Sequence, residues 1–247
     1  MLRALSTLLG TGIALILIVG VVLLVGTYTF LPPLVEWVVA RDVGERFETP
    51  GMPEVELESD PPPRMLAGEF SDGRVLLRDT HFGNVRAQSA ALDLDPFGLR
   101  VLDSFTSGRP IGEGPLSGRL RVEVSEGEVA RLVGANADVP VSSVELEESR
   151  MVVGSRAMVL GAEVPVSVAG DLQMHRGSLV FEPQQLEAAG VPVAGQLADR
   201  LLAGAEFVYP LAGLPHGARI TGVEVERGRL VLTGRVPAVP PGFEPGG

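Results

Sequence analysis

Cysteine and lysine are both absent from this chain of 247 residues. Without cysteine, the protein has no disulfide, no thiolate nucleophile and no zinc-thiolate site. All 20 basic residues are arginine. Because asparagine, isoleucine and tyrosine are scarce too, we interpret this as codon bias in a GC-rich genome rather than as phosphate recognition. Aromatic residues make up 5% of the chain, which is too few for a stacking platform for sugars or bases.

Positive charge is also in short supply. The formal net charge is -11, and the sequence pI is about 4.8. Nucleic-acid binding depends on neutralising phosphates with basic side chains, so nucleic acid is excluded as a partner. Nonspecific adhesion to anionic lipid is disfavoured for the same reason.

Catalytic motifs are missing as well. The histidines His81, His175 and His216 lie in turns or beside glycines, where we expect solvated side chains. No His-x-x-x-His pair, no Gly-x-Ser-x-Gly elbow and no phosphate-binding loop occurs in the sequence. We therefore expect no catalytic residue, no metal site and no cofactor.

Two pairs of carboxylates need separate consideration. Asp93 and Asp95 flank Leu94, and Glu145 and Glu147 have the same spacing. Paired acids can carry out glycosidic chemistry, so a hydrolase acting on envelope glycan is one interpretation. Both pairs alternate with apolar residues, however, as the solvent-facing positions of a strand do. We favour that second interpretation.

What the chain does contain is a long apolar run near its start. Leu8 to Phe30 has no charged residue, and about 20 apolar residues let a helix cross a bilayer. A cleaved signal peptide is the alternative, but signal peptides have a shorter apolar core than this run and end in small residues. We therefore predict a signal-anchor transmembrane helix over residues 1–30. Because Arg3 precedes the run, the protein is expected in the cell membrane, single-pass, with its domain on the extracytoplasmic side.

The rest of the chain is predicted to form one domain, residues 31–236, and a disordered Pro/Gly tail, residues 237–247. An amphipathic helix is expected over residues 33–47, where valines recur at every fourth position. Such a helix either docks onto the domain or lies on the membrane, and we favour docking. Further helices are expected after the capping-box pattern Ser125–Glu128 and from Val191 to Ala203.

Most of the domain shows the two-residue alternation of β-strands. The longest alternating stretch runs from Val164 to Met174, with strands expected on either side of it. Hairpin-connected strands with few helices predict an α+β fold, in which a curved antiparallel sheet is wrapped around helices. The other expected strands are 55–58, 75–78, 85–94, 119–124, 151–160, 179–181, 220–226 and 229–236.

The predicted helices are few and short for the apolar strand faces they have to cover. Acyl chains would fill the remaining apolar volume, whereas an ordinary filled core is the alternative. The lipid-binding candidates are apolar positions of the central strands and of the helix expected after them: Val164, Val166, Val168, Leu172, Met174, Leu179, Phe181, Val193, Leu197 and Leu201.

Two segments carry a family resemblance. The stretch from Pro210 to Gly234 contains Leu-Pro-x-Gly, a strand, a tight turn and a strand ending in glycine. Pro63-Arg-Met-Leu-Ala-Gly68 looks like a Pro-Phe-Leu-x-x-Leu-x-Gly segment that has lost its phenylalanine. With the order of elements from Leu34 to Val236, these motifs resemble an actinobacterial cell-envelope family of phospholipid-binding proteins, formerly a domain of unknown function. One member supports elongation of the mannan chain of lipomannan.

The resemblance implies a fold like that of tubular lipid-binding proteins, with a curved sheet around a long helix and an apolar cavity. It also implies binding of anionic phospholipid or phosphatidylinositol-type lipid, and it does not imply an enzyme. We therefore expect a membrane-anchored, non-catalytic phospholipid-binding protein that supports cell-envelope lipid or lipoglycan assembly. The alternative is a structural scaffold that holds an envelope glycosyltransferase at the membrane.

Overall fold

The structure is a computed structural model. It describes residues 33–45, 49–82, 85–136, 140–159, 162–195, 198, 202, 207–211 and 217–239. The anchor predicted over residues 1–30 lies outside these residues, as does most of the predicted tail. Within the described part, none of the helices is both long and apolar enough to cross a membrane.

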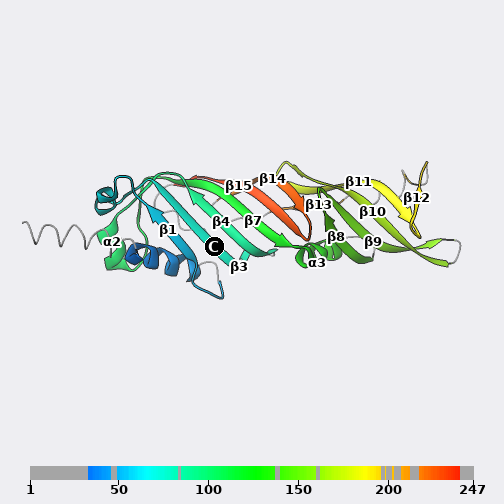
Figure 1. The fold of residues 1–247 in the computed structure, drawn as a ribbon, viewed down its shortest axis with the longest axis horizontal. Helices are drawn as coiled ribbons and strands as arrows, with labels where there is room; N and C mark the ends of the chain where they lie inside the picture. The colour runs from blue at the N-terminus through cyan, green and yellow to red at the C-terminus, as the bar shows by residue number, and fades with distance from the viewer. Residues whose placement is uncertain are drawn as a thin grey trace, which may run out of the picture.

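Two large antiparallel sheets lie end to end along the long axis of the molecule (Figure 1). The first, sheet A, has the strand order β1-β3-β4-β7-β15-β14. Its strands are β1 (Glu54–Glu58), β3 (Asp72–Phe82), β4 (Val85–Leu94), β7 (Leu116–Ser125), β14 (Arg219–Glu226) and β15 (Arg229–Val239).

The second large sheet, sheet C, has the order β12-β11-β10-β9-β8, and β13 pairs with the same strand β11. Its strands are β8 (Val141–Glu147), β9 (Arg150–Val159), β10 (Ala162–His175), β11 (Ser178–Ala188), β12 (Val191–Val193) and β13 (Phe207–Pro210). A small sheet B contains β2 (Glu69–Phe70), β5 (Phe97–Leu99) and β6 (Gly112–Glu113).

Helices lie at one end of the molecule and at the junction of the sheets. Residues 33–45, here called the N-terminal helix, are helical. They lie beside sheet A at the end where α2 (Val101–Ser107) is also found (Figure 1). α3 (Glu126–Asn136) lies where sheet A meets sheet C and contacts both β7 and β8. A short 3-10 helix, η1 (Pro62–Ala67), precedes β2.

The antiparallel α+β prediction is confirmed, with the strands divided among three sheets rather than gathered in one. The long alternating strand is β10, and its predicted turn at Arg176-Gly177 has positive φ at both residues. That backbone suits the two-residue hairpin that joins β10 to β11. The capping box is confirmed in one half, since the Glu128 amide donates to Oγ of Ser125 at 3.4 Å.

One predicted element is wrong at its start. The helix expected from Val191 to Ala203 begins as a strand, because Val191–Val193 form β12 and pair with Leu186–Ala188 of β11. Val191 and Val193 flank a proline, and both valines are β-branched, which favours an edge strand over a helix. Leu197 and Leu201 lie outside the described residues.

The N-terminal helix docks onto the domain, as predicted. Val35 and Val38 are buried, and Oε1 of Glu36 accepts a hydrogen bond from the Leu57 amide of β1 at 3.2 Å. Val35 and Leu57 belong to a small apolar cluster with Met65, Phe70 and Leu99. The segment that carries part of the family resemblance is therefore structural: Met65 is in this cluster, and Gly68 ends η1.

Gly68 ends η1 with φ of 80°. A side chain at this position would overlap the carbonyl oxygen of Leu99, whose amide donates to the Gly68 carbonyl at 2.8 Å. Both the left-handed conformation and the close approach of the Leu99 backbone require glycine.

Candidate functional site

The main core runs continuously from sheet A into sheet C. It combines the inner residues of sheet A with Val129 and Val133 of α3 and with inner residues of β8 to β11. The register of sheet C shows how its part of this core is built, since directly paired residues on neighbouring strands face the same side.

The candidate residues of β10 and β11 lie on one face of sheet C. Leu172 pairs with Phe181, and Phe181 pairs with Phe207 of β13, with the two phenylalanine rings stacked at 5.5 Å between centroids. Met174 pairs with Leu179 in the next row. The interpretation of these residues as one apolar face is thus supported, and the bonds between strands hold them in place.

A second row crosses the whole sheet. Val168 pairs with Val153 on one side and with Leu186 on the other. Val153 pairs in turn with Val144, and Leu186 pairs with Val193. Five apolar side chains from five strands therefore line up on the same face. Val166 and Val164 extend this face toward the far end of the sheet.

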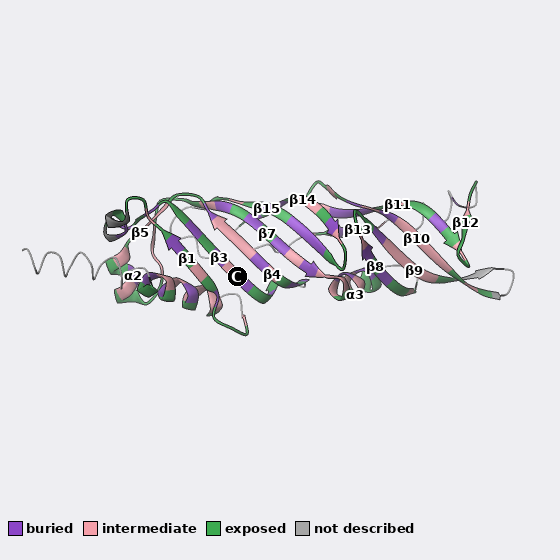
Figure 2. Ribbon diagram, viewed as in Figure 1, coloured by how far each residue is buried: buried purple, intermediate pink, exposed green. Residues whose placement is uncertain are grey.

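Burial differs along this face. Met151, Leu172, Leu179 and Phe181 are buried, whereas most of the outer positions are half-buried, and β9 and β10 are mostly intermediate in burial (Figure 2). Val144 and Leu186, in the row of Val168, are buried as well. We call the half-buried outer positions the apolar band: Val153, Val164, Val166, Val168 and Val193. None of their in-register partners is ionisable. The band can thus contact an apolar ligand but offers it no charged partner across the sheet.

Sequence reasoning missed several members of this face. Val153 lies within the strand expected over 151–160, but it follows another valine and shows no clear alternation. Leu186 lies beyond the strand expected over 179–181, although its polar neighbours Gln185 and Glu187 could have extended that strand. Phe207 and Tyr209 form the apolar side of a four-residue strand, and so short a segment gives a weak periodic signal.

A small apolar cavity lies at the other end of the molecule, between the N-terminal helix and α2. Its volume is about 10 Å³, and it is lined by Val35, Val38, Val39, Leu99, Val101, Ser104, Phe105 and Pro110. That volume has room for about one water molecule. As it stands, it cannot hold an acyl chain.

The paired carboxylates are on the surface and do not converge. Asp93, on sheet A, accepts from Nε of Arg74 at 2.8 Å, and Asp95 accepts from the Ser117 hydroxyl at 2.7 Å. Glu145 and Glu147 belong to β8 of sheet C. Among the described residues, no group of three or more His, Asp or Glu side chains could hold a metal ion.

The described structure thus has an apolar interior that runs through two open antiparallel sheets and is only partly covered on sheet C. The chain belongs to the LmeA-like phospholipid-binding family, whose model matches residues 26–235. The resemblance found in the sequence is thereby confirmed. Neither the curated proteins nor the solved structures contain a match to the chain.

Proposed function

We propose that the protein is a membrane-anchored, non-catalytic phospholipid-binding protein that works on the extracytoplasmic side. Its lipid would lie with its acyl chains against the apolar band of sheet C. Family membership supports phospholipid binding. The single observation that carries the location is the burial along the apolar face of β10, which falls from the buried Leu172 to the half-buried Val168, Val166 and Val164.

Energetics favour this use of the band. Each methylene group that leaves water contributes about 0.8 kcal/mol, so two acyl chains would bind firmly without a polar motif. The absence of ionisable partners across the band fits a ligand that is held by its chains rather than by its headgroup. Anchoring by residues 8–30, which contain no charge, would keep the domain within reach of its ligand.

Photocrosslinking of the full chain in vesicles tests the proposal. The vesicles carry a phospholipid with a diazirine in its acyl chain, and crosslinked positions are mapped by mass spectrometry. We expect crosslinks at Val166 and Val168. Val166→Glu should abolish them, because a carboxylate in the band is costly to desolvate. Val208→Glu is the matched control, since Val208 is 57% exposed and its position in β13 alternates with that of the inward-facing Phe207.

Crosslinks spread evenly over the protein, or none on sheet C, would contradict the proposal. If, in that case, the protein also bound an envelope glycosyltransferase, the scaffold alternative would replace the lipid-binding proposal. We also propose that the protein supports a step in the assembly of cell-envelope lipid or lipoglycan. Loss of that lipid or lipoglycan in cells that carry Val166→Glu, but not in cells that carry Val208→Glu, would support this role.

A further inference from the structure

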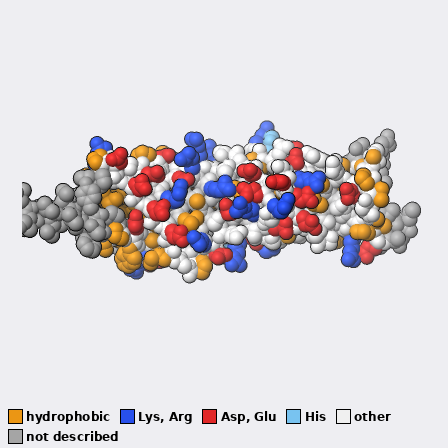
Figure 3. All heavy atoms as spheres, viewed as in Figure 1, with side chains coloured by type: hydrophobic (Ala, Val, Ile, Leu, Met, Phe, Trp, Pro, Cys, Tyr) orange, Lys and Arg blue, Asp and Glu red, His pale blue; other side chains and the backbone are white. Residues whose placement is uncertain are grey.

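Three large apolar side chains are exposed together at the end of the molecule opposite to the apolar band. Leu34 and Trp37 of the N-terminal helix are 51% and 49% exposed, and Leu102 of α2 is 81% exposed. Val35 of the N-terminal helix and Phe105 of α2 belong to one apolar cluster, and Val38 lines the small cavity between the two helices. Figure 3 shows hydrophobic side chains gathered at this end. We propose that this docking surface, Leu34, Trp37 and Leu102, rests on the lipid bilayer.

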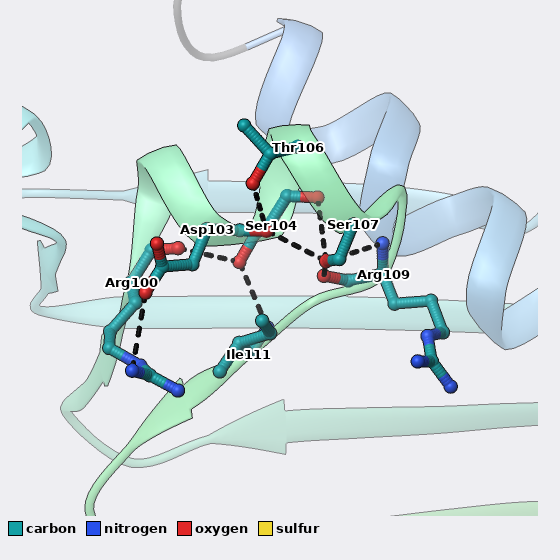
Figure 4. Close-up of polar contacts among 7 residues, drawn as sticks. All are labelled: Arg100, Asp103, Ser104, Thr106, Ser107, Arg109 and Ile111. Carbon is teal, nitrogen blue, oxygen red and sulfur yellow. Dashed lines mark hydrogen bonds and ion pairs between the residues drawn. The ribbon is translucent and has the colours of Figure 1, made fainter.

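The docking surface is held firmly, so the exposure of Leu102 is not that of a loose loop. The buried Ser104 hydroxyl donates to the Arg100 carbonyl at 2.8 Å and accepts from the Ile111 amide at 2.9 Å (Figure 4). The Arg100 amide donates to the Ile111 carbonyl at 2.8 Å. These bonds close the segment around α2 on itself. α2 therefore presents Leu102 to the outside as a fixed feature.

The exposed face of the N-terminal helix changes character along its length. Leu34 and Trp37 come first, and Arg41 and Glu45 follow, joined by an ion pair at 3.0 Å. The Arg41 guanidinium also lies 5.8 Å from the centre of the Trp37 ring. An apolar first half with a tryptophan at its border and a charged second half suits a helix that meets a membrane surface at its N-terminal end.

The position of the surface in the chain identifies its occupant. The apolar run predicted as the anchor ends at Phe30, and the described part of the N-terminal helix starts at residue 33, close behind it in the sequence. A bilayer crossed by that run lies within reach of Leu34 and Trp37. Leu102 is distant in sequence, yet the fold brings α2 to the same end. The inference rests on the proposed membrane anchoring and adds an orientation, in which the N-terminal helix and α2 face the bilayer and sheet C points away.

The contact would be apolar rather than electrostatic. The net charge of -11 disfavours attraction to an anionic bilayer. Because the anchor keeps the surface at a high effective concentration near the membrane, weak apolar contacts are sufficient. Docking is therefore expected to be insensitive to salt.

Tryptophan fluorescence tests the inference directly, because Trp37 is the single tryptophan of the chain. The full chain is reconstituted in phosphatidylcholine and phosphatidylglycerol vesicles whose acyl chains are brominated. Trp37 is expected to lose emission relative to unbrominated vesicles. The decisive variant is Leu102→Trp in a Trp37→Phe background, since tethering alone does not bring α2 to the lipid. Val208→Trp in the same background is the matched control on sheet C, away from the two helices.

We expect bromine to quench the tryptophan at position 102 and to leave the one at position 208 unchanged, at low and high salt alike. Equal, weak quenching at both positions in protein that floats with the vesicles after carbonate treatment would overturn docking and leave the anchor intact. Protein that fails to float would overturn the anchoring itself. If the emission of the tryptophan at position 102 changed with the density of protein in the vesicles but not with bromine, the docking surface would contact a second copy of the protein instead of lipid. If its quenching disappeared at high salt, the contact would be electrostatic rather than apolar.

Discussion

Sheets A and C share one sequence pattern but differ in how completely their apolar faces are covered. In sheet A the inner residues of the central strands, such as Ala90, Val122 and Leu232, are buried, and α3 closes one end. In sheet C the same alternation leads from buried residues to the half-buried apolar band (Figure 2). An alternating pattern thus identifies the apolar face of a strand, while only the arrangement of other elements decides whether that face is filled.

The largest effect is expected at Phe181, where the buried and the half-buried parts of the apolar face of sheet C meet. Phe181 is fully buried and stacks on Phe207. Phe181→Ala is expected to lower the free energy of unfolding by about 3–5 kcal/mol, the range for a phenylalanine removed from a packed core. Urea unfolding followed by circular dichroism measures this. Val208→Ala on the neighbouring strand, where the side chain is exposed, should change it by less than about 0.5 kcal/mol.

If Phe181→Ala lowered the free energy of unfolding as little as Val208→Ala, Phe181 would not belong to a packed core. The half-buried part of the apolar face would then extend closer to sheet A and include Phe181 and Phe207.

The two sheets are also joined by a specific hydrogen bond. Oε2 of Glu126, at the start of α3, accepts from the amide of the buried Leu146 in β8 at 2.7 Å. The Leu146 carbonyl in turn accepts from the Gly228 amide of the β14–β15 turn at 3.0 Å. Glu126→Ala would leave the Leu146 amide without its partner, so we expect a loss of about 1–3 kcal/mol in unfolding free energy.

Glu126→Gln is the matched control, because its amide oxygen can still accept from Leu146 and it should retain much of the stability. Hydrogen exchange at the Leu146 amide gives a local measurement, which is expected to speed up in the alanine variant. Unchanged exchange there would show that other contacts alone align the sheets.

The same valine-to-alanine substitution on each sheet measures how completely the apolar face of that sheet is covered. Val122→Ala removes two methyl groups from a sealed position, which corresponds to about 1.5 kcal/mol at roughly 0.8 kcal/mol per group. Val166→Ala removes the same groups from the apolar band and should cost less than half of that in lipid-free protein. Urea unfolding of both variants checks the ratio. Equal losses would show that the band is as well packed as sheet A.

The sequence predicted the parts of the fold that depend on local pattern. β10 and the hairpin β14–β15 were found because long alternation and tight turns are visible in the residues themselves. α2 was missed, because Val101-Leu-Asp-Ser-Phe-Thr-Ser107 is short and has low helix propensity. It is fixed by the buried Ser104 and its bonds to Arg100 and Ile111, which are contacts that no local pattern reveals.

The candidate site divides in the same way. The apolar face of β10 and β11 could be predicted, because paired strands bring alternating residues together. The gradient along that face could not, because Leu172 and Val166 occupy equivalent positions in the alternation and differ only in what lies opposite them. The docking surface depends on two helices that are far apart in sequence. Nothing in the sequence therefore indicated that Leu102 and Trp37 lie at the same end of the molecule.

α3 makes the matching connection to sheet A through Glu128, and here the expected effect is smallest. Its Oε1 accepts from the Arg86 amide of β4 at 2.9 Å. The hydrogen bond from Arg131 lowers the pKa of Glu128, and the Arg86 amide acts in the same direction against the opposing effect of burial. A lowered pKa in the folded state means that the stabilisation is complete above about 4.3, the ordinary glutamate pKa, and is lost as the pH falls through the lowered value.

Glu128→Gln should therefore cost about 1 kcal/mol or less near neutral pH, and the difference from the unsubstituted protein should vanish in acid. Urea unfolding across this pH range measures it. Combined with Arg131→Gln, the substitution should lose most of its pH dependence, because Arg131 is the largest cause of the shift. A difference that grew toward acid pH would have the wrong sign for a stabilised carboxylate. The connection of α3 to sheet A would then depend on packing of Val129 and Val133 alone, unlike its connection to sheet C.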